Sequence, residues 1–368
     1  MSGIATSAAI EFGMQFFPDV TPAQKSGAQY FDEALRLVEW CDVYGFGHVR
    51  IVEHYFHYWG GYSPNPIVFL TAASQRTRRA RLVTGAVLPS FNHPLKLAGE
   101  IGMLDAISGG RLDVGFARAF LPYEFRHFAV EMDSSVARFE EGIEQVRLLL
   151  EQENVSSNGR FHSFSGVTSL PRPTQQPRPN FYIAAVGTPE SFARAGRLGY
   201  GLMAIPGVGS TPSELSQIYR EAWRAAGHPG KPKVMMATFM YCHEDRAEAI
   251  RIAKPRIERH FASIADAMTE HAAGPLSKDY KNYDKMVDKI RAETFETQLA
   301  HHAAFVGTPR DIIEQINEFD RVMGGVDSAS LQVNFNDMAF HDAERSVRLF
   351  GEKVMPHFAA ARARAAAD

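Results

Sequence analysis

The chain has 368 residues, of which 45% are hydrophobic and 22% charged, and its formal net charge is −3. This composition is that of an ordinary globular protein, long enough for two medium domains or one large barrel. A slightly acidic chain has no long-range attraction for nucleic acid or an anionic membrane. Its two cysteines, Cys41 and Cys242, are far apart in sequence, which excludes a disulfide framework and a zinc-finger pattern.

The N-terminus and the hydropathy pattern predict a cytoplasmic protein. The first residues, MSGIATSAAIEFG, lack a basic region and reach Glu11 too early for a signal peptide. No apolar stretch approaches the roughly 20 residues that span a bilayer. The basic run RTRRAR (76–81) lies between a helical and a strand pattern, which favours a solvated helix end over a binding patch.

Strand-like and helix-like patterns alternate along the chain. Strands are expected at 9–17, 46–53, 80–88, 111–117, 180–186, 200–205, 233–242 and 328–335. Apolar residues at helical spacing follow each of them, at 25–45, 63–77, 93–108, 134–152, 189–199, 212–227, 245–265 and 343–361. Eight strand–helix pairs predict an α/β fold, a closed (β/α)8 TIM barrel. The rival, a doubly wound sheet, usually has fewer units and a glycine-rich first turn, which FFPDVTPAQ lacks.

We therefore expect one barrel domain over residues 1–368, with irregular insertions at about 153–180 and 262–308. The first insertion is rich in Gly, Ser and Pro, and GRFHSFSG suggests a small hairpin within it. The second contains the polar, turn-prone HAAGPLSKDYKNYDKM. Long insertions in a barrel are more often lids or binding loops than passive linkers.

Candidate functional residues follow the strands, where barrels carry their chemistry. Glu53 and His54 follow the second strand. His54 is a candidate base, metal ligand or packed histidine; Glu53 is a candidate hydrogen-bond acceptor that helps to hold the loop. A metal is disfavoured, because His54 and His57 face opposite ways on an extended segment and no further ligand motif accompanies them. We therefore predict no metal.

The turn AAVGTPES follows the fifth strand and opens a helix. Gly187 permits a close backbone approach, and Thr188 precedes Pro189 at the first helical position. Exposed N–H groups at such a helix start suit a phosphate, although this turn taken alone favours an ordinary capped helix. Arg118, after the fourth strand, either supplies a fixed positive charge to a phosphate or an electron-rich ring, or forms a surface ion pair.

Four segments together resemble one known family. VEHYFHYWGGYSPNP (52–66), LDAISGGRLDVGFARAF (104–120), AFVGTP (304–309) and VMPHF (354–358) are similar to segments of the flavin-dependent bacterial luciferase-like monooxygenases. The likeness is greatest to the branch of bacterial luciferase and the alkanal-oxidising enzymes. It runs in order from about residue 10 to residue 358 and so covers nearly the whole chain.

The resemblance implies a barrel that binds reduced FMN (FMNH2) at its rim and reacts it with O2. One oxygen atom then enters a small hydrophobic substrate by way of a flavin peroxide adduct. A separate flavin reductase would supply FMNH2, since no nicotinamide-binding motif is present here. The resemblance further implies a homodimer, paired through the helices after the second and third strands. Two alternatives stay open: a dehydrogenase that uses the deazaflavin F420, and a non-catalytic flavin-binding subunit.

The resemblance also assigns roles to individual residues. His54 looks like the catalytic histidine of the family and Glu53 like the glutamate that precedes it, so the catalytic residues implied are His54 and Glu53. Arg118 and the turn at 185–188 resemble the phosphate site, and 84–86 lie where the family has a non-prolyl cis peptide beneath the flavin. The segment 278–286 is similar to a mobile loop that closes over the pocket. The cofactor-binding residues implied in this way are Thr84, Gly85, Ala86, Ala117, Arg118, Ala185, Val186, Gly187 and Thr188.

Three departures separate this chain from luciferase itself. Ala117 replaces a cysteine near the reactive carbon of the flavin, and Tyr55 replaces the second histidine of the EHHF motif. The phosphate turn lacks an acidic–serine pair. These departures argue against light emission and leave oxygen transfer in place.

Overall fold

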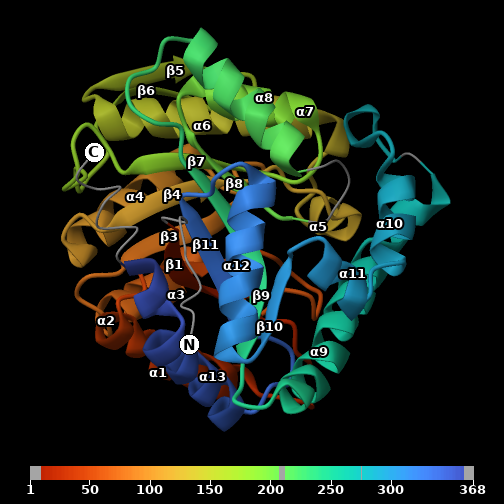
Figure 1. Ribbon diagram of the computed structural model, residues 1–368. Coiled ribbons are helices and arrows are strands. Elements are labelled where there is room, and N and C mark those ends of the chain that lie inside the picture. Colours follow the sequence, from red (N-terminus) through yellow and green to blue (C-terminus); the bar gives the residue numbers. More distant parts are fainter. Residues whose placement is uncertain (1–9, 207–211, 275, 360–368) are drawn as a thin grey trace.

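Eight parallel strands close into a barrel in the computed structural model, which describes residues 10–206, 212–274 and 276–359 (Figure 1). Around the barrel the order is β1, β2, β3, β4, β7, β8, β9 and β11, and β11 pairs with β1 to close the ring. The strands are β1 (Glu11–Phe16), β2 (His48–Ile51), β3 (Arg81–Val87), β4 (Leu112–Phe116), β7 (Asn180–Ala185), β8 (Gly201–Ala204), β9 (Val234–Cys242) and β11 (Ser328–Asn334). The predicted fold is therefore confirmed, and these strands fall within or very near the eight predicted ranges.

Helices surround this barrel (Figure 1). They are α1 (Gly27–Val38), α2 (Trp40–Tyr44), α3 (Pro66–Ser74), α4 (Pro94–Ser108), α5 (Pro122–His127), α6 (Ser135–Glu151), α7 (Pro189–Leu198), α8 (Pro212–Ala225), α9 (Arg246–Ala267), α10 (Tyr283–Arg291), α11 (Phe295–Ala300), α12 (Pro309–Met323) and α13 (Phe340–Lys353). Several begin as their sequences predict, with proline in the first turn after a capping residue such as Asn65, whose side chain accepts a hydrogen bond from the Ile67 N–H.

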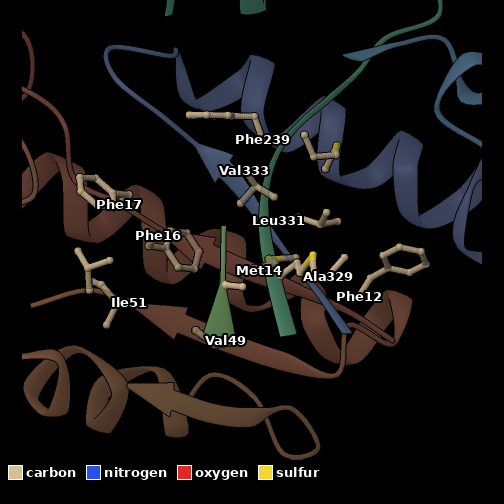
Figure 2. Packing of buried hydrophobic residues seen from close by; sticks show 14 of the residues in the cluster. Phe12, Met14, Phe16, Phe17, Val49, Ile51, Phe239, Ala329, Leu331 and Val333 are labelled. Atoms are coloured by element: carbon tan, nitrogen blue, oxygen red, sulfur yellow. The ribbon is translucent and has the colours of Figure 1, made fainter. Parts of the chain in front are cut away.

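Alternate residues of a strand face opposite sides of the barrel wall. On β1, Phe12 and Phe16 face outward and pack on rings of the surrounding helices, Phe350 at 5.3 Å and Phe69 at 5.5 Å. Figure 2 shows this apolar layer, to which β2, β9 and β11 also contribute. The intervening residues of β1 face the interior, and there Gln15 lies in register with Arg50 of β2 and Gln332 of β11.

The interior of the barrel is therefore divided. Polar side chains line it at β1, β2 and β11. A separate apolar cluster is formed on β3, β7, β8 and β9 by Val83, Tyr182, Met203 and Met235. Barrel interiors are usually filled with bulky apolar residues, so the polar side is a specific feature of this chain.

The two predicted insertions have different outcomes. The hairpin in the first is confirmed, as β5 (Val155–Asn158) pairs antiparallel with β6 (Ser163–Val167). The second is not irregular, because 262–308 contains the end of α9, α10, α11, β10 (Ala304–Gly307) and the 3-10 turns η2 (Thr269–Ala273) and η3 (Lys278–Tyr280). The segment is polar overall, but α10 has a few apolar residues at helical spacing, and two of them, Val287 and Ile290, are buried. A further 3-10 turn, η1 (Met132–Ser134), precedes α6.

No helix in the described part of the chain is long and apolar enough to cross a membrane. The cytoplasmic location stays a prediction, and residues 1–9, on which part of it rests, lie outside the described residues.

Candidate active site at the barrel rim

The predicted site residues lie at or directly after the ends of four neighbouring strands. β2, β3, β4 and β7 are hydrogen-bonded in this order, and all four are parallel. His54 follows β2, Gly85 and Ala86 belong to β3, and Arg118 follows β4. The turn at 186–188 follows β7. The residues thus form one arc at the carboxyl end of the barrel, which is where barrel enzymes bind their substrates.

His54 is paired with a carboxylate that the sequence analysis did not single out. Its Nδ1 lies 3.2 Å from Oε1 of Glu124, which is fully buried on α5. The same oxygen accepts a hydrogen bond from the Tyr55 N–H at 3.0 Å. With Glu124 ionised, Nδ1–H is the donor, so Nε2 is the nitrogen left to accept a proton.

Aromatic rings surround the His54 imidazole. The rings of Trp59, Phe17 and Phe120 have centroids at 4.5, 5.8 and 6.0 Å from it. His54 is only 8% exposed. Packing of this kind restricts the access of water to the imidazole. Among the described residues, no three His, Cys, Asp or Glu side chains come together as a metal site would require.

Glu53 points to different partners from those of His54. Its carboxyl group accepts hydrogen bonds from the Tyr55 hydroxyl at 2.6 Å, the Asn92 side-chain amide at 2.9 Å and the Leu88 N–H at 3.2 Å. Burial raises the pKa of Glu53 to about 8, although these three donors act in the opposite direction. Glu53 therefore joins the segment after β2 to the segment after β3. These contacts agree with the hydrogen-bond acceptor that we expected to help to hold the loop.

The strand end at 84–86 has the expected backbone. The peptide bond between Gly85 and Ala86 is cis. Thr84 is fully buried, and its hydroxyl donates to the Gly115 carbonyl at 3.0 Å and accepts from the Gly115 N–H at 2.9 Å. The Thr84 hydroxyl makes both of its hydrogen bonds within the barrel wall. If Thr84 contacts a ligand, the contact therefore comes from its backbone.

The phosphate end of the predicted site combines a helix start and an arginine. Thr188 precedes α7 with Pro189 at the first position, as predicted, but its side chain makes no capping hydrogen bond. Val186 is 38% exposed, and Thr188 is exposed as well. Ala117 and Arg118 are half-buried, whereas Ala185 is buried. The contacts of Arg118 among the described residues are with Tyr280 and Tyr283, so the surface ion pair, the alternative interpretation, is not observed there.

A segment from the second insertion covers this end of the arc. We call residues 269–274 and 276–286 the cover segment. The Arg118 guanidinium lies over the Tyr280 ring at 4.4 Å, and the Tyr283 hydroxyl is hydrogen-bonded to Arg118. His271 Nε2 contacts the Phe120 carbonyl at 2.7 Å, and the Tyr280 hydroxyl donates to the Ala119 carbonyl. The loop predicted to close over the pocket therefore packs directly on the residues after β4.

Sequence reasoning missed three residues that shape the site: Glu124, Tyr280 and Tyr283. The motif LPYEFRH carried a weak signal for Glu124, because a proline after Leu121 predicts a helix start and Glu124 lies in its first turn. No pattern indicated which face of that turn points to His54. The two tyrosines lie in the segment 278–286, which the resemblance implied would close over the pocket, but no pattern indicated that their side chains contact Arg118.

Comparison with known proteins places the chain in a family. Residues 10–327 match the luciferase-like monooxygenase family. The chain belongs to the luciferase-like monooxygenases. This match confirms the predicted family, and together with the relatives below it confirms the predicted enzyme class, the flavin-dependent monooxygenases.

Individual relatives cover nearly the whole chain. The structure of the monooxygenase RslO1 from Streptomyces bottropensis is 43% identical, with a TM-score of 0.84, over 95% of this chain and all of that one. The oxygenase component of the flavin-dependent trigonelline monooxygenase from Acinetobacter baylyi is 28% identical over 346 residues, 91% of this chain and 92% of the relative. Coenzyme F420-dependent tetrahydromethanopterin reductase from Methanopyrus kandleri shares the fold, at 20% identity and a TM-score of 0.67, over 95% of this chain and 99% of the other.

Proposed function

We propose that this luciferase-like enzyme uses reduced FMN and O2 to insert one oxygen atom into a small hydrophobic substrate. One observation carries the proposal. A buried imidazole held by a carboxylate lies on the same arc of the rim as Arg118, which has no carboxylate partner among the described residues, and as the start of α7, where Thr188 makes no side-chain cap. The arc thus combines a proton acceptor in an aromatic enclosure with donors for a phosphate.

The residues of the arc fit FMN by their chemistry. Arg118 and the backbone of 186–188 would hold the phosphate, because a guanidinium and helix N-terminal N–H groups both favour an anion. The backbone of 84–86 would support the ring system, together with Ala117 and Ala185. Bound reduced FMN supplies the two electrons with which O2 is activated.

His54 and its aromatic neighbours have two tasks in this proposal. Trp59, Phe17 and Phe120 restrict water, which would otherwise divert the activated oxygen to hydrogen peroxide. His54 Nε2 takes up a proton from the substrate or the oxygen species, while Glu124 fixes Nδ1–H. Glu53 acts by holding the backbone on either side of the site.

The phosphate site is tested by comparing FMN with riboflavin, which lacks the phosphate. In Arg118→Ala the affinity for FMN should fall about tenfold or more, with little change for riboflavin, because a charge-assisted contact to phosphate is lost. Arg197→Ala is the matched control, since Arg197 lies on α7 and pairs with Glu190 instead. Equal FMN affinity in wild type and Arg118→Ala would remove Arg118 from the site.

The reaction is tested with reduced FMN and O2. His54→Ala should still bind FMN, whereas a larger share of the reducing equivalents should appear as hydrogen peroxide and a smaller share as oxygenated product. Incorporation of label from 18O2 into a candidate substrate identifies oxygen transfer directly. If His54→Ala leaves the yield of hydrogen peroxide unchanged, His54 is not part of the oxygen chemistry.

Two partner assignments belong to the proposal. A separate flavin reductase as the source of reduced FMN is supported by the trigonelline relative, which is named as an oxygenase component. A homodimer through α3 and α4 is supported by exposed apolar side chains on these helices: Val68 is 68% exposed and Met103 57%.

An F420-dependent dehydrogenase is the second candidate, because the same barrel occurs in an F420-dependent reductase. That chemistry transfers a hydride and needs no O2. Anaerobic reduction of F420 by a substrate in the presence of this protein would favour it over the monooxygenase.

A further inference from the structure

Arg50 carries a buried positive charge in the barrel interior, without a carboxylate partner among the described residues. Its side chain is 5% exposed; one terminal nitrogen donates to Gln15 Oε1 at 2.6 Å and the other to the Gly85 carbonyl at 3.2 Å. Burial lowers the pKa of Arg50 to about 10, which still leaves the guanidinium charged at neutral pH. Buried charges in proteins are normally paired, so this charge is available to an anion.

The neighbours of Arg50 add donors and no negative charge. Gln15 lies between Arg50 and Gln332 in the register of β1, β2 and β11, and the Gln15 side-chain amide donates to Gln332 Oε1 at 3.5 Å. On these strands Arg50 Nε, Gln332 Nε2 and both polar atoms of the Asn334 side chain are buried without a hydrogen-bond partner among the described residues. A fixed cation with an unpaired donor of its own and neutral neighbours favours a ligand with negative charge.

Arg50 also lies directly against the backbone that we propose to support the flavin. A Cβ atom added to Gly85 would lie 2.1 Å from Arg50 Nε, so the Arg50 side chain occupies the space along Gly85 where other residues carry a side chain. The Arg50 guanidinium is therefore the charged group adjacent to the cis peptide of Gly85 and Ala86.

We propose that Arg50 is a cofactor-tuning residue, whose uncompensated charge stabilises the anionic reduced flavin over the neutral oxidised flavin. The inference rests on the proposed function and deepens it. Reduction places a delocalised negative charge on the isoalloxazine ring, and a nearby fixed cation in a medium of low dielectric constant favours that form. The protein thereby selects the reduced cofactor that a reductase delivers.

The experiment measures the dissociation constants of oxidised FMN and of chemically reduced FMN, the latter anaerobically, for each variant. In Arg50→Met the preference for reduced over oxidised FMN should fall about tenfold, while Arg50→Lys should largely keep it. Gln332→Glu introduces a carboxylate on the far side of Gln15, in the same polar layer as an intact Arg50, and we expect a fall in the same direction. Arg81→Met is the matched control, because Arg81 is a barrel arginine already paired with Asp113 at 2.5 Å.

The outcomes separate this inference from the proposed function. A reduced preference in Arg50→Met and Gln332→Glu, with Arg50→Lys and Arg81→Met near wild type, supports it. If Arg50→Met fails to fold, the preferences of Gln332→Glu and Arg50→Lys for reduced over oxidised FMN still test the role of Arg50. An unchanged preference in Gln332→Glu and Arg50→Met, with FMN still bound, overturns the role of Arg50 alone. Wild-type protein that binds neither form of FMN removes the proposed function and this inference with it.

Discussion

The guanidinium carbon of Arg118 lies 4.4 Å from the centre of the Tyr280 ring, and the Tyr280 hydroxyl donates to the carbonyl of Ala119, the next residue. The residue proposed to bind the phosphate of FMN is thus covered by a ring from the cover segment. The ring covers one face of the guanidinium and leaves its edge N–H groups to a phosphate, so we expect the cover segment to limit the exchange of the cofactor.

Removing the ring should therefore speed the exchange of FMN. In Tyr280→Ala we expect FMN to associate and dissociate several-fold faster, and a larger fraction of reduced FMN to be lost as hydrogen peroxide, because the rim is more open to water. Tyr280→Phe keeps the ring over Arg118 and removes only the hydroxyl, so it should stay closer to wild type. Stopped-flow fluorescence of FMN measures both rates; identical rates in wild type and Tyr280→Ala would rule out a gating role.

The contact between His54 and Glu124 predicts that the two residues act as one unit. In Glu124→Gln the release of hydrogen peroxide from bound reduced FMN after mixing with O2 should rise about tenfold, since the charged acceptor that orients a functional histidine is replaced by a neutral amide. Combining Glu124→Gln with His54→Ala should add little to His54→Ala alone. Exposed Glu131→Gln is the control. Additive effects in the double variant would show that Glu124 works independently of His54.

The buried carboxyl group of Glu53 predicts a pH-dependent stability. Its pKa is about 8 in the folded protein, above the ordinary value of 4.5, so the folded state holds this proton over a pH range in which the unfolded state releases it. The contribution of Glu53 to the free energy of unfolding therefore falls as the pH rises from about 4.5 to about 8.

Glu53→Gln, which is neutral at every pH, should flatten this dependence. We expect the Tm of the wild type to decline by a few degrees more than that of Glu53→Gln between pH 5.5 and pH 8.5. Calorimetry at several pH values measures the difference. Parallel curves for the two proteins would place the titration of Glu53 outside this range.

Exposed apolar side chains on α3 and α4 predict where two copies meet. Val68→Glu combined with Met103→Glu should raise the dissociation constant of the proposed dimer by about 100-fold or more, because two charges would be placed in an apolar contact. Val43→Glu is the matched control, since Val43 is 62% exposed on α2. Light scattering over a range of protein concentrations measures the mass; a wild-type protein that stays monomeric throughout would refute the dimer.

Local patterns were sufficient to predict the barrel. Each strand and helix is a short periodic segment, and eight repeats of the pair leave few topologies that can bury all the apolar faces. The patterns failed at 262–308, where polar residues outnumber the few apolar ones that make α10 amphipathic. The patterns also did not determine in which direction the side chains point in the segment after each strand.

The sequence by itself determined the closed barrel, the family and the arc of strand ends that carries His54, Gly85, Arg118 and the turn at 186–188, because these follow from segments that are contiguous in the chain. Only the tertiary structure decided the partners of those residues. Glu124 lies 70 positions from His54 and Tyr280 lies 162 from Arg118, and the partner of a side chain depends on the relative placement of whole elements. Among the described residues no carboxylate lies beside Arg50. This too is a property of the folded barrel, since it depends on which side chains of three neighbouring strands stand in register with one another.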